Sequence, residues 1–127
     1  MPIEMETVAF IDSELGDDLV VSFAIEDPAD RTEIQSLTLL RMPKYENVLD
    51  PEERGVKVSF DRYLDDDDRR DLLESVRFSE EEKTMHLETT FHWYDLDLRK
   101  IDAQELMKMR KVLRQMNRDG RFRVEGL

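Results

Sequence analysis

The side chains best suited to metal or acid–base chemistry lie in residues 84–94, TMHLETTFHWY. The alternation of residue types predicts a single strand here, with His86, Glu88 and His92 on one face. Along an extended strand His86 and Glu88 are close enough to share a metal ion, whereas His92 lies roughly 13 Å beyond Glu88. A complete site would need a ligand from a neighbouring strand, such as Glu74. We expect a polar sheet surface, and a metal-dependent enzyme at His86 and Glu88 is the least favoured of three hypotheses.

The densest charge in the chain lies in residues 61–71, DRYLDDDDRRD. Carboxylates at alternate positions of a loop can converge on a calcium ion. Counted from Asp61 or from Asp65, however, the segment has neither the glycine at position six nor the glutamate at position twelve of a calcium-binding loop. We interpret it as a solvated acidic loop.

Other catalytic signatures are missing from the sequence. It contains no cysteine, which excludes disulfides, thiolate zinc sites and a cysteine nucleophile. It also contains no glycine-rich phosphate loop and no serine nucleophile motif. The N-terminal residues lack the basic and apolar parts of a signal peptide, and no apolar run approaches the roughly 18 residues of a membrane span. We therefore predict a non-enzymatic, cytoplasmic protein of bacterial type, a single domain over residues 1–127, with no metal and no cofactor.

The element that organises the chain is a predicted helix over residues 102–118, DAQELMKMRKVLRQMNR. Asp102 is suited to cap its first N–H groups, Glu105 to complete a capping box, and Gly120 to follow its end. At about 100° per residue, the apolar side chains fall within one arc of about 120°, which is wide enough to bury against a sheet. They are Leu106, Met109, Val112, Leu113 and Met116. The opposite side carries a basic file, Arg110, Arg114 and Arg118.

The rest of the chain reads as strands and turns. Residues 19–26 and 33–42 carry apolar side chains on both faces, which is typical of interior strands. The predicted strands are 7–11, 19–26, 33–42, 56–60, 72–78 and 84–94, with a short further strand at 121–124. We predict an α+β fold, a twisted and mostly antiparallel sheet of about six strands with the C-terminal amphipathic helix packed on one face.

Charge is distributed unevenly along the chain. The formal net charge is -12 overall, with -17 over residues 1–98 and +5 over residues 99–127. Phosphate binding needs positive potential over a broad surface, so a nucleic-acid contact through the basic file is disfavoured. An anionic body instead speeds encounter with a cationic protein and makes that encounter sensitive to salt.

The order of elements resembles one known family. An apolar run that ends in Arg41 (Leu37, Thr38, Leu39, Leu40, Arg41), a hairpin over residues 74–89 (ESVRFSEEEKTMHLET) and a closing amphipathic helix are similar to the small acidic immunity proteins of bacterial polymorphic toxin systems, specifically the tenth immunity family. The similarity covers roughly residues 5–117. It implies a stoichiometric inhibitor that binds a toxin domain, and it transfers no functional residue.

Three hypotheses follow for function. The first is an acidic binding protein that recognises a basic protein partner, with toxin neutralisation as its most concrete form. The second is a small structural or self-associating protein, a homodimer through Val20, Ala24 and the mixed faces of residues 33–42. The third is the metal-dependent enzyme. Neither nucleic acid nor membrane is an expected partner. By charge alone, the predicted binding residues are Asp65, Asp66, Asp67, Asp68, Glu80, Glu81 and Glu82.

Overall fold

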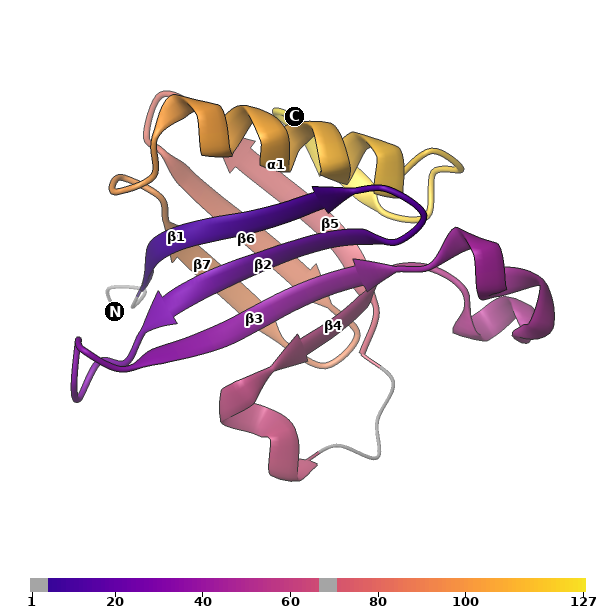
Figure 1. Ribbon diagram of the computed structural model, residues 1–127, viewed down its shortest axis with the longest axis horizontal. Helices are drawn as coiled ribbons and strands as arrows, with labels where there is room; N and C mark the ends of the chain where they lie inside the picture. Colours follow the sequence, from indigo (N-terminus) through magenta and orange to yellow (C-terminus); the bar gives the residue numbers. More distant parts are fainter. Residues whose placement is uncertain (1–4, 67–70) are drawn as a thin grey trace.

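One mixed β-sheet and one α-helix make up the fold in the computed structural model, which describes residues 5–66 and 71–127, with the backbone alone for 64–66 (Figure 1). The strand order is β4-β3-β2-β1-β7-β6-β5-β8. The strands are β1 (Glu6–Leu15), β2 (Leu19–Glu26), β3 (Ile34–Arg41), β4 (Lys57–Phe60), β5 (Leu73–Ser79), β6 (Thr84–Thr89), β7 (Trp93–Asp97) and β8 (Arg123–Glu125). The helix α1 spans Ala103–Met116, and three 3-10 helices are η1 (Pro43–Val48), η2 (Pro51–Glu53) and η3 (Asp61–Asp66).

The α+β class is confirmed, but the predicted sheet of about six mostly antiparallel strands is wrong in its number of strands and in part of its pairing. Over the described residues the sheet has eight strands. Two pairs in it are parallel, β1 with β7 and β5 with β8. Both parallel pairs join segments that are distant in sequence, so no local turn signal announces them.

The sheet is strongly curved, so that β4 at one edge of the strand order approaches the start of β5 in the other half of the sheet. Lys57 of β4 forms an antiparallel bridge with Leu72, just before β5. Backbone hydrogen bonds from Val58 N to the Asp71 oxygen (2.9 Å) and from Leu73 N to the Val56 oxygen (2.9 Å) complete the junction. In Figure 1, β1 to β4 lie in front and β5 to β7 behind them. The inner faces of the two halves enclose the core, where side chains such as Phe23, Leu39, Leu87 and Leu96 are fully buried.

Residues 84–94 do not form the single strand that alternation predicts. The chain reverses after Thr89, and β6 continues as β7 running antiparallel beside it. Within the turn, Thr89 N donates to the His92 oxygen (2.9 Å). Asp71, from outside the hairpin, accepts hydrogen bonds from the Thr89 hydroxyl (2.9 Å) and from Phe91 N (3.1 Å). A carboxylate brought in by the tertiary fold thus fixes a turn that contains no glycine or proline.

The helix follows its prediction closely. It begins after Asp102, whose carboxylate accepts a hydrogen bond from Glu105 N (2.9 Å), and the five predicted core side chains are all buried. Gly120 adopts a positive φ of 71°, the left-handed conformation that glycine tolerates after a helix. The capping-box role of Glu105 is wrong, because its carboxylate instead accepts a hydrogen bond from Ile11 N of β1 (3.3 Å). β7 pairs with β1 only at Glu6 and Thr7, so the backbone N–H of Ile11 has no partner on β7. The Glu105 carboxylate accepts the hydrogen bond from that N–H instead.

Candidate functional site

The acidic binding residues predicted by charge lie in two stretches of the chain, and part of the first stretch falls outside the described residues. Asp65 and Asp66 lie in η3, where the structure describes only the backbone. Asp67 and Asp68 fall outside the described residues. Glu80, Glu81 and Glu82 are exposed in the turn between β5 and β6. Figure 1 places η3 and that turn at opposite ends of the molecule. A single partner face therefore does not contain both of them.

Two of the three arginines in the basic file on α1 contact other residues of the same chain. Arg110 stacks over the Phe78 ring, 5.2 Å from its centroid, and lies 3.8 Å from a Glu80 oxygen. Arg114 donates to the Leu127 oxygen through two nitrogens, at 3.2 and 3.3 Å. Arg118 is exposed and makes no side-chain ion pair with the described residues. Two of the three arginines thus serve the packing of the helix, and only Arg118 is available to a ligand.

The metal-capable side chains are rearranged by the β6–β7 turn. Asp95 of β7 lies directly opposite His86, and its carboxylate is 2.6 Å from Nδ1, while Nε2 is 3.2 Å from Glu88. Burial lowers the pKa of His86, but the hydrogen bonds to Asp95 and Glu88 outweigh it and leave that pKa raised. His92 instead stacks on Tyr63. Across residues 5–66 and 71–127, no group of three or more histidines and carboxylates has a metal-binding arrangement.

Several charged side chains on the outer face of β5 to β8 are paired with one another. His86 lies between its two carboxylates, and Arg77 of β5 lies 3.3 Å from Glu125 of β8. Trp93 stands on this face with 76% of its surface exposed. The face therefore combines an exposed aromatic ring with internally paired charges.

The β1–β2 hairpin, unlike the outer face of β5 to β8, carries charged side chains that have no ion-pair partner among the described residues. Asp12 and Glu14 point outward from β1, and Asp17 and Asp18 form the turn after Gly16. All four are exposed, and none has an ion pair within the part of the chain that the structure describes. Phe10 and Leu15, on the same strand, are 51% and 49% exposed. We call Asp12, Glu14, Asp17 and Asp18 the acidic hairpin.

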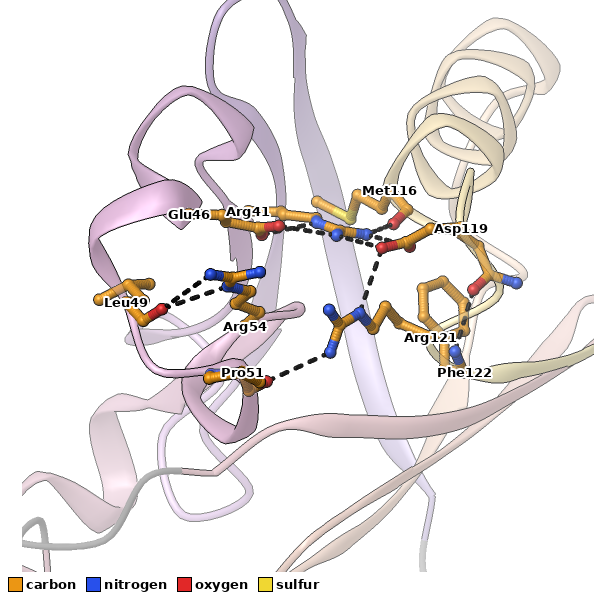
Figure 2. Close-up of polar contacts among 10 residues, drawn as sticks. Arg41, Glu46, Leu49, Pro51, Arg54, Met116, Asp119, Arg121 and Phe122 are labelled. Atoms are coloured by element: carbon orange, nitrogen blue, oxygen red, sulfur yellow. Dashed lines mark hydrogen bonds and ion pairs between the residues drawn. The ribbon is translucent and has the colours of Figure 1, made fainter.

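A second cluster of charged side chains lies at the same end of the sheet, and in it every N–H group of the Arg41 guanidinium donates a hydrogen bond (Figure 2). Arg41, only 6% exposed, donates from Nε and Nη2 to Glu46 (2.8 and 2.9 Å) and from Nη1 and Nη2 to Asp119 (2.8 Å each). Its Nη1 also donates to the Met116 carbonyl, one of the open groups at the end of α1. Arg121 adds a contact to Asp119 (3.1 Å) and another to the Pro51 oxygen (3.4 Å). We call Arg41, Glu46, Asp119 and Arg121 the Arg41 cluster.

The Arg41 cluster ties three separate segments together. It joins the end of β3 to η1 through Glu46 and to the residues after α1 through Asp119. Hydrogen bonds from Arg41 hold the pKa values of Asp119 and Glu46 below their usual ranges. The sequence carried one unused signal, because Arg41 shares the inward parity of Leu37 and Leu39 and an arginine in that position needs buried acceptors.

Beside this cluster an open hollow of about 600 Å³ adjoins a second of about 360 Å³. The walls of the first are the β1–β2 turn, the start of η1 and the last turn of α1. Both hollows include Leu19, Pro43, Gln115 and Arg118 in their lining, so they form one depression, which we call the α1-end groove. Sequence periodicity gives no signal for it, because its walls come from three distant segments.

Comparisons with known proteins assign no family. The sequence matches no protein-family model, and no curated protein and no solved structure is significantly similar to it. Within the described residues, no helix has the length and apolar character needed to cross a bilayer.

Proposed function

We propose that this chain is an acidic binding protein that recognises a cationic protein partner through the β1–β2 hairpin. The observation that carries the proposal is the acidic hairpin, four exposed carboxylates without cationic neighbours in ion-pair contact over the described residues, beside the half-exposed Phe10 and Leu15. A partner that brings lysine or arginine side chains would supply the missing counter-charges.

The placement of the positive charges strengthens this proposal. Three arginines form ion pairs with carboxylates outside the hairpin: Arg62 with Glu6, Arg99 with Asp97 and Arg110 with Glu80. Lys100 likewise pairs with the buried Glu26 (2.7 Å). None of these four cations is in ion-pair contact with a carboxylate of the hairpin, which remains a source of negative potential.

The apolar side chains give the same surface a means of tight contact. Phe10 of β1 lies opposite Ala24 of β2, and Val20 lies between Glu14 and Leu40 on the outer face of the sheet. Interfaces gain most of their affinity from a few apolar and aromatic side chains, whereas charge around them sets association rate and partner choice. The most concrete form of this function is the immunity-type toxin inhibitor, which the order of elements resembles.

The test is affinity capture from a native bacterial lysate at low and high salt, followed by kinetics with the recovered protein. We expect one cationic protein, retained at low salt and lost as the salt concentration rises, because screening shortens the reach of the field. The decisive variant combines Asp12→Asn, Glu14→Gln, Asp17→Asn and Asp18→Asn. Its dissociation should be at least about tenfold faster, since it removes contacts as well as long-range attraction.

Two matched controls remove similar charge elsewhere. One combines Glu80→Gln, Glu81→Gln and Glu82→Gln, and the other changes Asp65, Asp66, Asp67 and Asp68 to asparagine. Both should slow association and leave dissociation nearly unchanged. If either control accelerates dissociation while the hairpin variant does not, the docking surface belongs to that patch and the hairpin assignment is wrong.

Self-association is the second candidate, because Val20 and Leu40 lie side by side and half-buried on the outer face and Phe10 is exposed nearby. Ala24, predicted to share this role, is only 5% exposed and offers little contact area. Sedimentation at micromolar concentration separates the two candidates. A tight dimer that Phe10→Ser dissociates would favour self-association, and a monomer leaves the face to a different protein.

A further inference from the structure

We propose that the α1-end groove binds a small amphipathic carboxylate, with the apolar part against the β1–β2 turn and the carboxylate between η1 and α1. The groove has two chemically different sides. Leu15, which is 49% exposed, lies with Leu19 and Pro43 on the apolar side. Lys44, Gln115 and Arg118 provide the polar side, and every one of them is a hydrogen-bond donor.

The two cations of the groove are not held by a carboxylate of the described chain. Arg41, Arg62 and Arg99 each bind a carboxylate of the chain. Lys44 and Arg118, by contrast, make no ion pair with any residue that the structure describes, and the Lys44 Nζ lies 5.9 Å from the centroid of the Tyr45 ring. Their position is what points to a ligand, because both line one hollow from two different segments and can bind an external anion there together.

The charge of the lining selects the type of anion. Lys44 and Arg118 face one carboxylate of the same hollow, Asp17, while Asp119 beside it is already bound by Arg41 and Arg121. The net charge of the lining suits one negative charge, and the negative end of the α1 dipole opposes a polyanion. Together with the apolar side, this favours a monocarboxylate with a hydrocarbon part over phosphate. A hollow of about 600 Å³ lies within the size range of small-molecule sites.

This site goes beyond the proposed function, since it concerns a small ligand. Leu15 and Asp17 belong to both surfaces, so an occupied groove would lie at the margin of the partner face.

The experiment is a ¹H–¹⁵N NMR titration of the whole chain with octanoate, octan-1-ol and inorganic phosphate. Octanoate should shift the Gly16 backbone amide and the Gln115 side-chain amide, and it should bind at least about tenfold tighter than octan-1-ol, which lacks the charge. Phosphate should leave these signals unmoved. Shifts that are equal for octanoate and octan-1-ol, or that fall on other parts of the sheet, would overturn the proposal.

Variants test the individual roles. Arg118→Gln and Lys44→Gln should each weaken octanoate binding about tenfold, and Leu15→Ser should weaken it by removing apolar contact. Lys111→Gln is the matched control, because Lys111 is an exposed cation of the same helix outside the lining. All four positions are exposed, so the variants should fold, which the unchanged signals of the β5–β6 hairpin would verify. Equal affinities of Arg118→Gln and Lys111→Gln would contradict the carboxylate site.

Discussion

The acidic hairpin and the Arg41 cluster lie at the same end of the sheet and use charge in opposite ways. Leu19, which follows the hairpin turn, pairs directly with Arg41. In the cluster each carboxylate accepts hydrogen bonds from an arginine, and Arg41 is almost completely buried. In the hairpin the carboxylates are exposed and make no ion pair with the described residues. Burial with a partner makes charge part of the fold, whereas exposure without one leaves it for recognition.

The largest effect should come from breaking the cluster with Arg41→Met. This change removes the Arg41 donors from Glu46 and from the Met116 carbonyl. Removing one member of a fully buried charge network costs about 3–5 kcal/mol, and the expected loss lies at the lower end because Asp119 is 46% exposed. Urea unfolding measures the loss. The control Arg121→Gln removes a partly exposed contact to the same Asp119 and should cost less than about 1 kcal/mol. If both variants lose equally little, the Arg41 cluster does not hold the fold together.

A smaller effect should appear in the pH dependence of stability. The folded-state pKa values of Asp119 and Glu46 are lowered by Arg41, so their contribution is present above the unfolded values of 3.8 and 4.5 and is lost as the pH falls towards the folded ones. Asp119 is 46% exposed, and solvent screening reduces its share. Thermal unfolding from pH 6 to pH 2 should show a loss of stability in the wild type that is reduced in Arg41→Met. Parallel profiles for the two proteins would contradict the assignment.

Neutralising the acidic hairpin should change stability by less than about 1 kcal/mol, with a slight gain at low salt because like charges no longer repel. We expect the neutralised hairpin to change the affinity for the partner rather than the free energy of unfolding. Asparagine is tolerated in turns, so the substitutions at Asp17 and Asp18 preserve the turn. A loss of stability comparable with that of Arg41→Met, in the same unfolding measurement, would erase the distinction between the two regions.

The smallest effect concerns His86, whose charge is paired on the outer face of β6 and β7. Its pKa is raised above 6.5, so its contribution to stability is full below pH 6.5 and disappears as the pH rises through the folded value. Asp95, Glu88 and the register partner Arg77 are the charged groups that face it. Asp95→Asn should lower the pKa of His86, and an NMR titration of the ring protons measures the shift. An unchanged pKa would mean that Asp95 does not stabilise the protonated imidazole of His86.

Local signals predicted a large part of the fold. The bounds of β2 match their prediction, and α1 begins at the predicted cap and buries the five predicted side chains. These features depend on periodicity, capping and turn residues within a few positions of one another. The acidic excess was also readable from composition. The carboxylates of the hairpin are spaced along a strand and its turn, so they do not stand out as a run of acidic letters as residues 65–68 and 80–82 do.

The sequence by itself therefore determined where the helix and most of the strands lie, which side of the helix is buried, and that the chain carries an acidic excess. The tertiary structure decided that Asp71 would divide residues 84–94 into two strands, that Asp95 would meet His86, and that Arg41 would collect Glu46 and Asp119. The physical reason is that each of these contacts joins residues whose proximity depends on strand pairing. Periodicity shows which face a side chain is on, and only the folded chain shows what lies opposite it.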